Sequence, residues 1–152
     1  MTRILVDADA CPVVNIILRV AAEHSVPVML LCDTAHELHR DGADTIVVEK
    51  GADSVDFKLV NLVHSTDIVV TQDYGLAAMC LARRARVLHQ NGIEYTDSNI
   101  DAMLMSRHIG KKIRRAGGRT RGPSPRTATE DAAFEAALRQ ILQTTEKALT
   151  ER

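Results

Sequence analysis

The sequence predicts a three-layer α/β fold built on a mainly parallel sheet. Short runs of apolar residues alternate with longer stretches in which apolar residues recur at helical spacing, and polar, glycine or proline residues separate them. Strands that alternate with helices in this way form βαβ units with right-handed crossovers. Because the predicted strands are continuously apolar, we expect helices to cover both faces of the sheet.

In the first part of the chain, two strands enclose a helix and a third strand follows. Residues 4–6 form a short apolar run that ends at an aspartate. Proline suits the first turn of a helix, and apolar residues then recur every three or four positions, which predicts a helix over 12–24. The runs 28–32 and 45–49 predict the next two strands, and the polar segment 33–44 predicts a loop or a short helix between them.

The central part of the chain continues the alternation. A helix is expected from Gly51 to about His64, because its apolar residues share one face. The apolar run 67–71 predicts a fourth strand, and Asp73 is expected to begin another helix. Residues 86–89 then predict a short fifth strand, which ends before an Asn-Gly turn signal.

The last third contains two predicted helices joined by a segment rich in glycine and proline. Ser98 followed three positions later by Asp101 resembles a capping box, which predicts a helix over 98–116. Residues 117–128 predict a mobile connection. A final helix over 129–148 carries a stripe of apolar residues suited to packing.

Size and composition are typical of one soluble domain. The chain has 152 residues, of which 45% are apolar and 26% charged. We expect a single α/β domain over residues 1–128, with the helix 129–148 packed on it. No apolar run approaches the roughly 20 residues of a membrane span, and the start of the chain does not resemble a signal peptide. Three cysteines without CxxC spacing fit reduced thiols, so we expect a cytoplasmic protein without membrane contact.

Five aspartates fall where strands of the predicted sheet end. They are Asp7 and Asp9 after the first strand, Asp53 and Asp56 at the start of the helix after the third, and Asp73 after the fourth. Because ligands bind at the carboxyl ends of parallel strands, we expect these carboxylates to converge there. Crowded carboxylates repel one another unless a cation offsets their charge, and oxygen ligands without histidine or cysteine suit Mg²⁺ or Mn²⁺. Carboxylate-held cations of this kind support phosphodiester cleavage.

Three of these aspartates also have a purely structural interpretation. Asp53 and Asp73 are suited to capping the helices that follow them, and Asp56 to bonding back to the cap from the third helical position. Asp7 and Asp9 have no such capping role. Their occurrence together with the other three at one sheet edge favours a metal site.

Two other groups of residues carry weaker signals for chemistry. Cys11 lies beside the aspartates, which raise the pKa of a thiol, and no histidine close in the sequence offers a base. A packed thiol is therefore favoured over a nucleophile. His36 and His39 with Cys32 lack a fourth ligand for zinc, which favours surface histidines.

Basic residues are concentrated in one stretch. Residues 102–128 hold eight Lys/Arg and no acidic residue, whereas residues 1–101 hold 15 Asp/Glu and eight Lys/Arg. This asymmetry indicates RNA or another polyanion as partner, although neutralisation of the acidic body or self-association into a homo-oligomer are alternatives. Aromatic residues, at 3%, are too few for a ladder of stacked bases. The candidate phosphate-binding residues are Lys58, Arg107, Lys111, Lys112, Arg114, Arg115, Arg119, Arg121 and Arg126.

Four ordered motifs resemble the uncharacterised bacterial YaiI/YqxD family. They are ILVDADACP, KGADSVDFKLVN, DIVVTQDYGLA and GPSPRT, and the resemblance covers nearly the whole chain. That family looks like a branch of the PIN-like, NYN-related nuclease fold. The resemblance implies metal ligands at Asp7, Asp56 and Asp73, accessory roles for Asp9 and Asp53, and contact of Lys58 with phosphate.

Three hypotheses for function follow. The first is a Mg²⁺- or Mn²⁺-dependent nuclease that acts on RNA, with Asp9 helping to position water. The second is a non-catalytic nucleic-acid-binding or regulatory protein of the same fold, favoured because no second acidic residue follows Asp73 closely. The third is an aspartyl-phosphate phosphatase of the haloacid dehalogenase type, because Asp7 and Asp9 resemble its nucleophile and acid/base, and Thr71 ends a later strand.

Overall fold

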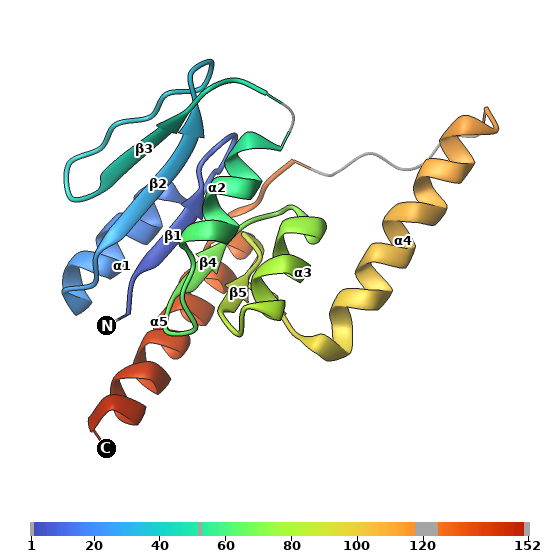
Figure 1. Ribbon diagram of the computed structural model, residues 1–152. Coiled ribbons are helices and arrows are strands. Elements are labelled where there is room, and N and C mark those ends of the chain that lie inside the picture. The colour runs from blue at the N-terminus through green and yellow to red at the C-terminus, as the bar shows by residue number, and fades with distance from the viewer. Residues whose placement is uncertain (1, 52, 118–124, 151–152) are drawn as a thin grey trace.

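The computed structural model describes residues 2–51, 53–117 and 125–150 and confirms the three-layer α/β architecture (Figure 1). The strands are β1 (Ile4–Asp7), β2 (Val28–Asp33), β3 (Asp44–Val48), β4 (Ile68–Val70), β5 (Arg86–Leu88) and β6 (Glu94–Tyr95). The helices are α1 (Val14–His24), α2 (Ser54–Leu62), α3 (Tyr74–Ala82), α4 (Asp97–Arg115) and α5 (Ala128–Thr150). Among the described residues, no helix is long and apolar enough to cross a membrane.

The path of the chain reverses in the middle of the sheet. The strand order is β3-β2-β1-β4-β5-β6, so the chain moves outward from β1 through β3 and then returns to the other side of β1. The strands β1 to β5 are parallel, and in the β1–β4 pair Val6 lies opposite Val70. The carboxyl ends of β1 and β4 therefore form a topological switch point, which is where open α/β sheets bind ligands.

Neighbouring residues of β1 face opposite layers of the core. Ile4 and Val6 pack toward α1 and α5, whereas Leu5 packs toward α2, α3 and the start of α4. All three side chains are fully buried, which explains why β1 is apolar at consecutive positions. The predicted stripe of the last helix is also buried in the first of these layers, through Phe134, Leu138, Ile141 and Leu142.

The short strand β6 is not among the strands predicted from the sequence. It runs antiparallel to β5, with Glu94 opposite Leu88, after a turn at Gly92. Gly92 has a φ of +90°, and a Cβ at this position would lie 2.6 Å from the carbonyl oxygen of Ala133 in α5. Only glycine fits there, because both the backbone conformation and the close approach of α5 exclude a side chain.

Two helices begin earlier than predicted because other residues cap them. For α4 the predicted start is Ser98, but Thr96 and Asn99 bond reciprocally: each backbone N–H donates to the other's side-chain oxygen, at 2.9 and 3.2 Å. Thr127 and Glu130 form the same arrangement at the start of α5, with distances of 3.2 and 3.3 Å. The pattern of threonine followed three residues later by Asn or Glu was present in the sequence at both places. Conversely, α1 begins two residues later than predicted, at Val14.

Arg126 ties the segment before α5 to the turn between β5 and β6. Its Nε donates to Asp131 Oδ1 at 2.6 Å, and its Nη2 donates to the carbonyl oxygen of Gln90 at 2.7 Å. Its Nη1 donates to Asn91 Oδ1 at 3.3 Å. This guanidinium, a candidate for phosphate binding in the sequence, is engaged with the protein itself at all three nitrogens.

Substitution of Arg126 by alanine is expected to lower the free energy of unfolding by about 2 kcal/mol. The reason is that the substitution removes a charged donor and all three of its hydrogen bonds at once. Urea denaturation of the two proteins measures the difference. The matched control is Arg40→Ala, at an exposed arginine, where a change within about 0.5 kcal/mol is expected. Equal losses in the two variants would show that the Arg126 contacts do not stabilise the fold.

Candidate functional site

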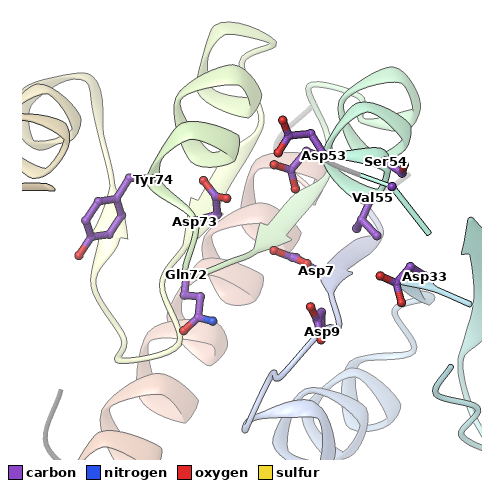
Figure 2. Close-up of a pocket in the computed structure, with 11 residues that line it drawn as sticks. Asp7, Asp9, Asp33, Asp53, Ser54, Val55, Gln72, Asp73 and Tyr74 are labelled. Carbon is purple, nitrogen blue, oxygen red and sulfur yellow. The ribbon is translucent and has the colours of Figure 1, made fainter. Parts of the chain in front are cut away.

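An acidic pocket opens at the carboxyl ends of β1 and β4 (Figure 2). It has a volume of about 530 Å³, and its lining includes all five aspartates that the sequence singled out. The sixth acidic residue of the lining, Asp33, was missed, although it ends the second strand just as Asp7 ends the first. The full lining is Asp7, Asp9, Asp33, Gly51, Asp53, Ser54, Val55, Asp56, Gln72, Asp73 and Tyr74.

Asp7 is the last residue of β1, and Thr71 orients its carboxylate. Thr71 Oγ1 donates to Asp7 Oδ2 at 2.9 Å and accepts the backbone N–H of Asp73 at 3.0 Å. The Thr71 carbonyl oxygen in turn accepts the hydroxyl of Tyr95 at 3.2 Å. Thr71 is buried, so its hydroxyl links the ends of two neighbouring strands and fixes the position of the acid. From the sequence, Thr71 was associated only with the phosphatase hypothesis, and its role in positioning Asp7 was not predicted.

The two predicted helix caps behave differently. Asp73 caps α3, since its Oδ1 accepts the backbone N–H groups of Gly75 at 2.8 Å and Leu76 at 3.1 Å. Asp53 occupies the N-cap position of α2 but makes no side-chain capping bond, because its backbone is left-handed, with a φ of +61°. The capping interpretation is therefore right for Asp73 and wrong for Asp53, and both residues line the pocket.

Burial and mutual repulsion raise the pKa of two of the pocket carboxyls. At Asp56 burial is the main cause, and the charges of Asp73, Asp7 and Asp53 add to it, which raises the pKa to about 6. Burial also raises the pKa of Asp7; the hydrogen bond from Thr71 opposes this effect, and the charges of Asp73 and Asp9 reinforce it. The described lining contains no lysine or arginine. Such a pocket favours a bound cation, because burial and mutual repulsion disfavour its negative charges.

The carboxylates surround the pocket rather than forming a closed cage. Among the described residues, no group of three or more His, Cys, Asp or Glu side chains stands ready to hold a metal ion. A dehydrated ion such as zinc in a structural site would need such a cage. Mg²⁺ does not, because it keeps several waters and is commonly bound through one or two carboxylates and substrate phosphates. The oxygen-only donor set and the room for water therefore fit a hydrated Mg²⁺ or Mn²⁺.

The structure brings none of the described basic residues into the lining of the acidic pocket. Lys58 is exposed on α2, and Lys112 is exposed on α4. Figure 1 shows that α4 leads away from the sheet after its first turns, which pack on α3 through Ile100 and its neighbours. The structure describes only the backbone at Arg107, Lys111, Arg114 and Arg115, and Arg119 and Arg121 lie outside the described residues.

Of the thiol and histidine candidates, Cys11 and His36 lie beside the acidic pocket. Burial is the main cause that raises the pKa of the Cys11 thiol, which makes it a poor nucleophile. His36 is exposed, and its Nδ1 lies 2.8 Å from Asp33 Oδ1 and 3.7 Å from Asp9 Oδ1. His39 is exposed and pairs with Glu37 at 3.2 Å. These contacts are those of surface histidines, as the sequence favours.

Comparison with known proteins identifies relatives over most of the chain. The family model described as "Uncharacterized BCR, YaiI/YqxD family" matches residues 5–144. A UPF0178 protein of Exiguobacterium sibiricum is 52% identical over 140 residues, which cover 92% of this chain and 96% of that protein. A UPF0178 protein of Clostridium acetobutylicum is 54% identical over 142 residues, which cover 92% of this chain and 96% of that protein. A UPF0178 protein of Bacillus cereus is 41% identical over 143 residues, which cover 92% of this chain and 98% of that protein. No solved structure matches the chain.

Proposed function

The chain belongs to the uncharacterised YaiI/YqxD family, and we propose that it is a Mg²⁺- or Mn²⁺-dependent nuclease that cleaves RNA. The observation that carries the proposal is the acidic pocket at the switch point between β1 and β4. Its carboxylates lie at or after the ends of four strands, β1 to β4, and two of them have raised pKa values that a divalent cation would relieve. A role confined to local helix capping does not account for Asp53, whose side chain makes no capping bond, or for Asp7, whose carboxylate accepts the hydroxyl of Thr71.

Asp7, Asp56 and Asp73 would hold the cation, with Asp53 bonding to its waters. A bound divalent ion lowers the pKa of water and stabilises charge on the leaving oxygen of a phosphodiester. Asp9 is exposed at the pocket rim, where it is suited to accept a proton from the attacking water. Thr71 keeps the Asp7 carboxylate oriented by its hydrogen bond to Oδ2.

Phosphate binding is assigned to Lys58 and to the basic residues of 102–128 other than Arg126. These residues are rich in positive charge and contain no acid, so they would supply affinity that does not depend on sequence and falls with salt. RNA that extends from the acidic pocket toward α4 would meet both kinds of charge. Arg126 is excluded from this role because its guanidinium is bonded to Asp131, Gln90 and Asn91.

A second candidate function is nucleic-acid binding without catalysis. It is favoured by the commitment of Asp73 Oδ1 to helix capping and by the open spacing of the carboxylates among the described residues. The phosphatase hypothesis is less well supported. Thr71, which that hypothesis needs for phosphate, is buried and donates its hydroxyl to Asp7 instead.

The proposal is tested by incubating the purified chain with end-labelled single-stranded and hairpin RNA in Mg²⁺, Mn²⁺ or EDTA. We expect cleavage products with Mg²⁺ or Mn²⁺ and none with EDTA. Binding measured in EDTA should weaken steeply with salt, and each phosphate-contacting Lys/Arg replaced should lower the logarithmic salt slope by about 1. Salt-sensitive binding without turnover in either metal would instead establish the second candidate function.

A further inference from the structure

A second cavity adjoins the acidic pocket. It has a volume of about 560 Å³, within the range of small-molecule sites. Gln72 and Tyr74 line both cavities, so these two residues form the wall between them. The rest of its lining is Pro12, His89, Gln90, Asn91, Arg126 and Glu130. A ligand that occupies the acidic pocket can therefore reach the second cavity without crossing the protein core.

Two aromatic rings on the wall of this cavity rest on a third. Tyr74 and His89 have ring centroids 6.3 Å apart, and both are only partly buried. Beneath them lies Tyr95, at 5.9 Å from Tyr74 and 5.8 Å from His89, and it is 1% exposed. The chain contains only two tyrosines, and both belong to this cluster. This packing supports both rings beside the cavity.

His89 presents a neutral ring. Burial is the main cause that lowers its pKa, and the positive charge of Arg126 adds to the effect. Its Nδ1 accepts the backbone N–H of Asn91 at 2.9 Å, so the neutral ring carries its proton on Nε2. The cavity therefore offers two uncharged aromatic rings and one ring N–H donor.

Side-chain amides line the rim beside these rings. The side-chain Nε2 of Gln90 donates to the side-chain Oε1 of Gln72 at 3.1 Å. This bond leaves Nε2 of Gln72 as a donor and Oε1 of Gln90 as an acceptor for a ligand. Arg126 and Glu130 hold the opposite side rigid through their bonds to the turn after β5 and to the start of α5. Flat rings with both donors and acceptors at their edge match the chemistry of a nucleobase.

We propose that this cavity is a base pocket, which takes one unpaired nucleobase next to the phosphodiester that lies in the acidic pocket. The base stacks on the ring of Tyr74 and packs against His89, whose ring is inclined to it by 43°, and its edge bonds to the amides of Gln72 and Gln90. This inference rests on the proposed function and narrows it to single-stranded nucleic acid, because a paired base cannot enter. One base pocket is compatible with a chain whose aromatic content, 3%, excludes a ladder of stacked bases.

The test uses probes that bind without cleavage. The intact ¹⁵N-labelled protein is titrated with AMP, UMP or ribose 5-phosphate in EDTA, and backbone amide signals are followed by NMR. We expect AMP or UMP to shift the signals of Tyr74, His89 and Gln90, and ribose 5-phosphate to leave them in place. Equal shifts with ribose 5-phosphate would mean that the cavity recognises phosphate alone, and no shift with any probe would exclude binding; either result overturns the proposal.

Variants of the two rings test stacking directly. Tyr74→Leu keeps apolar volume and His89→Gln keeps polar atoms near the N–H of Asn91, and each should weaken nucleotide binding about fivefold or more. Phe57→Ala is the matched control, because Phe57 is an aromatic residue on α2, 60% exposed and outside both cavities. Wild-type affinity in both folded variants would overturn the base pocket.

The outcomes separate this inference from the nuclease proposal. Nucleotide binding that depends on Tyr74 and His89, without RNA cleavage in Mg²⁺ or Mn²⁺, would keep the base pocket and remove the nuclease. Metal-dependent RNA cleavage, together with a nucleotide affinity that neither substitution changes, would support the nuclease and overturn the base pocket.

Discussion

Asp7→Asn should lower the rate of RNA cleavage at least about a hundredfold and abolish Mn²⁺ binding, while the fold stays intact. The substitution removes a negative charge at the end of β1 without changing the size of the side chain. An amide oxygen can still accept the hydroxyl of Thr71, which bonds to the present carboxylate at 2.9 Å. Burial no longer opposes a charge at this position, so no loss of stability is expected. Cleavage time courses, Mn²⁺ titration by calorimetry and thermal unfolding measure the three effects.

The matched control for this experiment is Asp44→Asn. Asp44 is exposed and begins β3, opposite Met29 near the start of β2. It therefore lies at the amino-terminal ends of the parallel strands, whereas the acidic pocket lies at their carboxyl ends. We expect cleavage and Mn²⁺ binding by this variant to equal those of the wild type. Full activity of Asp7→Asn would instead remove the metal-dependent nuclease from consideration.

Asp56→Asn should raise the free energy of unfolding at pH 7.5 by about 1–2 kcal/mol when EDTA removes divalent cations. The pKa of Asp56 is raised from 3.8 to about 6 in the folded chain, chiefly by burial and then by the charges of Asp73, Asp7 and Asp53. Between these two values the folded state binds more protons than the unfolded state, so wild-type stability falls as pH rises from about 4 to about 6. Above pH 6 the carboxylate is ionised in both states, and the full cost of its charge is present. The amide carries no charge and escapes this cost.

Urea denaturation of both proteins at pH 4, 5, 6 and 7.5 measures this effect. The gain from Asp56→Asn should be absent at pH 4 and complete at pH 7.5. Mn²⁺ should raise the free energy of unfolding of the wild type at pH 7.5. The increase should be smaller at pH 5, where Asp56 is largely protonated, and it should be very small for the variant at either pH. A variant that is less stable than the wild type at pH 7.5 in EDTA would show that Asp56 is not under charge repulsion.

Much of the site could be predicted because parallel strands place their carboxyl ends at one edge. Asp7 and Asp73 lie at the ends of β1 and β4, and Asp56 lies in the first turn of the helix after β3. The same rule applied to the second strand would have found Asp33. The rule predicts which residues gather but not their spacing, which depends on side-chain directions that the sequence does not encode locally.

The long-range contacts of the site could not be predicted in this way. Thr71 and Asp7 are 64 residues apart, and their hydrogen bond depends on the register of β1 against β4. Arg126 belongs to a stretch without acidic residues, which favours phosphate binding, yet its partners Asn91 and Gln90 come from a turn 35 and 36 residues away. Contacts of this kind arise only when separate elements pack together.

The sequence by itself determined the alternation of strands and helices, the apolar character of the central strands and the edge of the sheet at which the aspartates gather. These properties follow from periodicity and from the residues next to one another in the chain. Tertiary structure alone decided that Thr71 bonds to Asp7, that Arg126 bonds to the turn after β5, and that Tyr74, His89 and Tyr95 form one cluster. The reason is physical, because such contacts join elements far apart in the chain whose relative position is set by packing of the whole core.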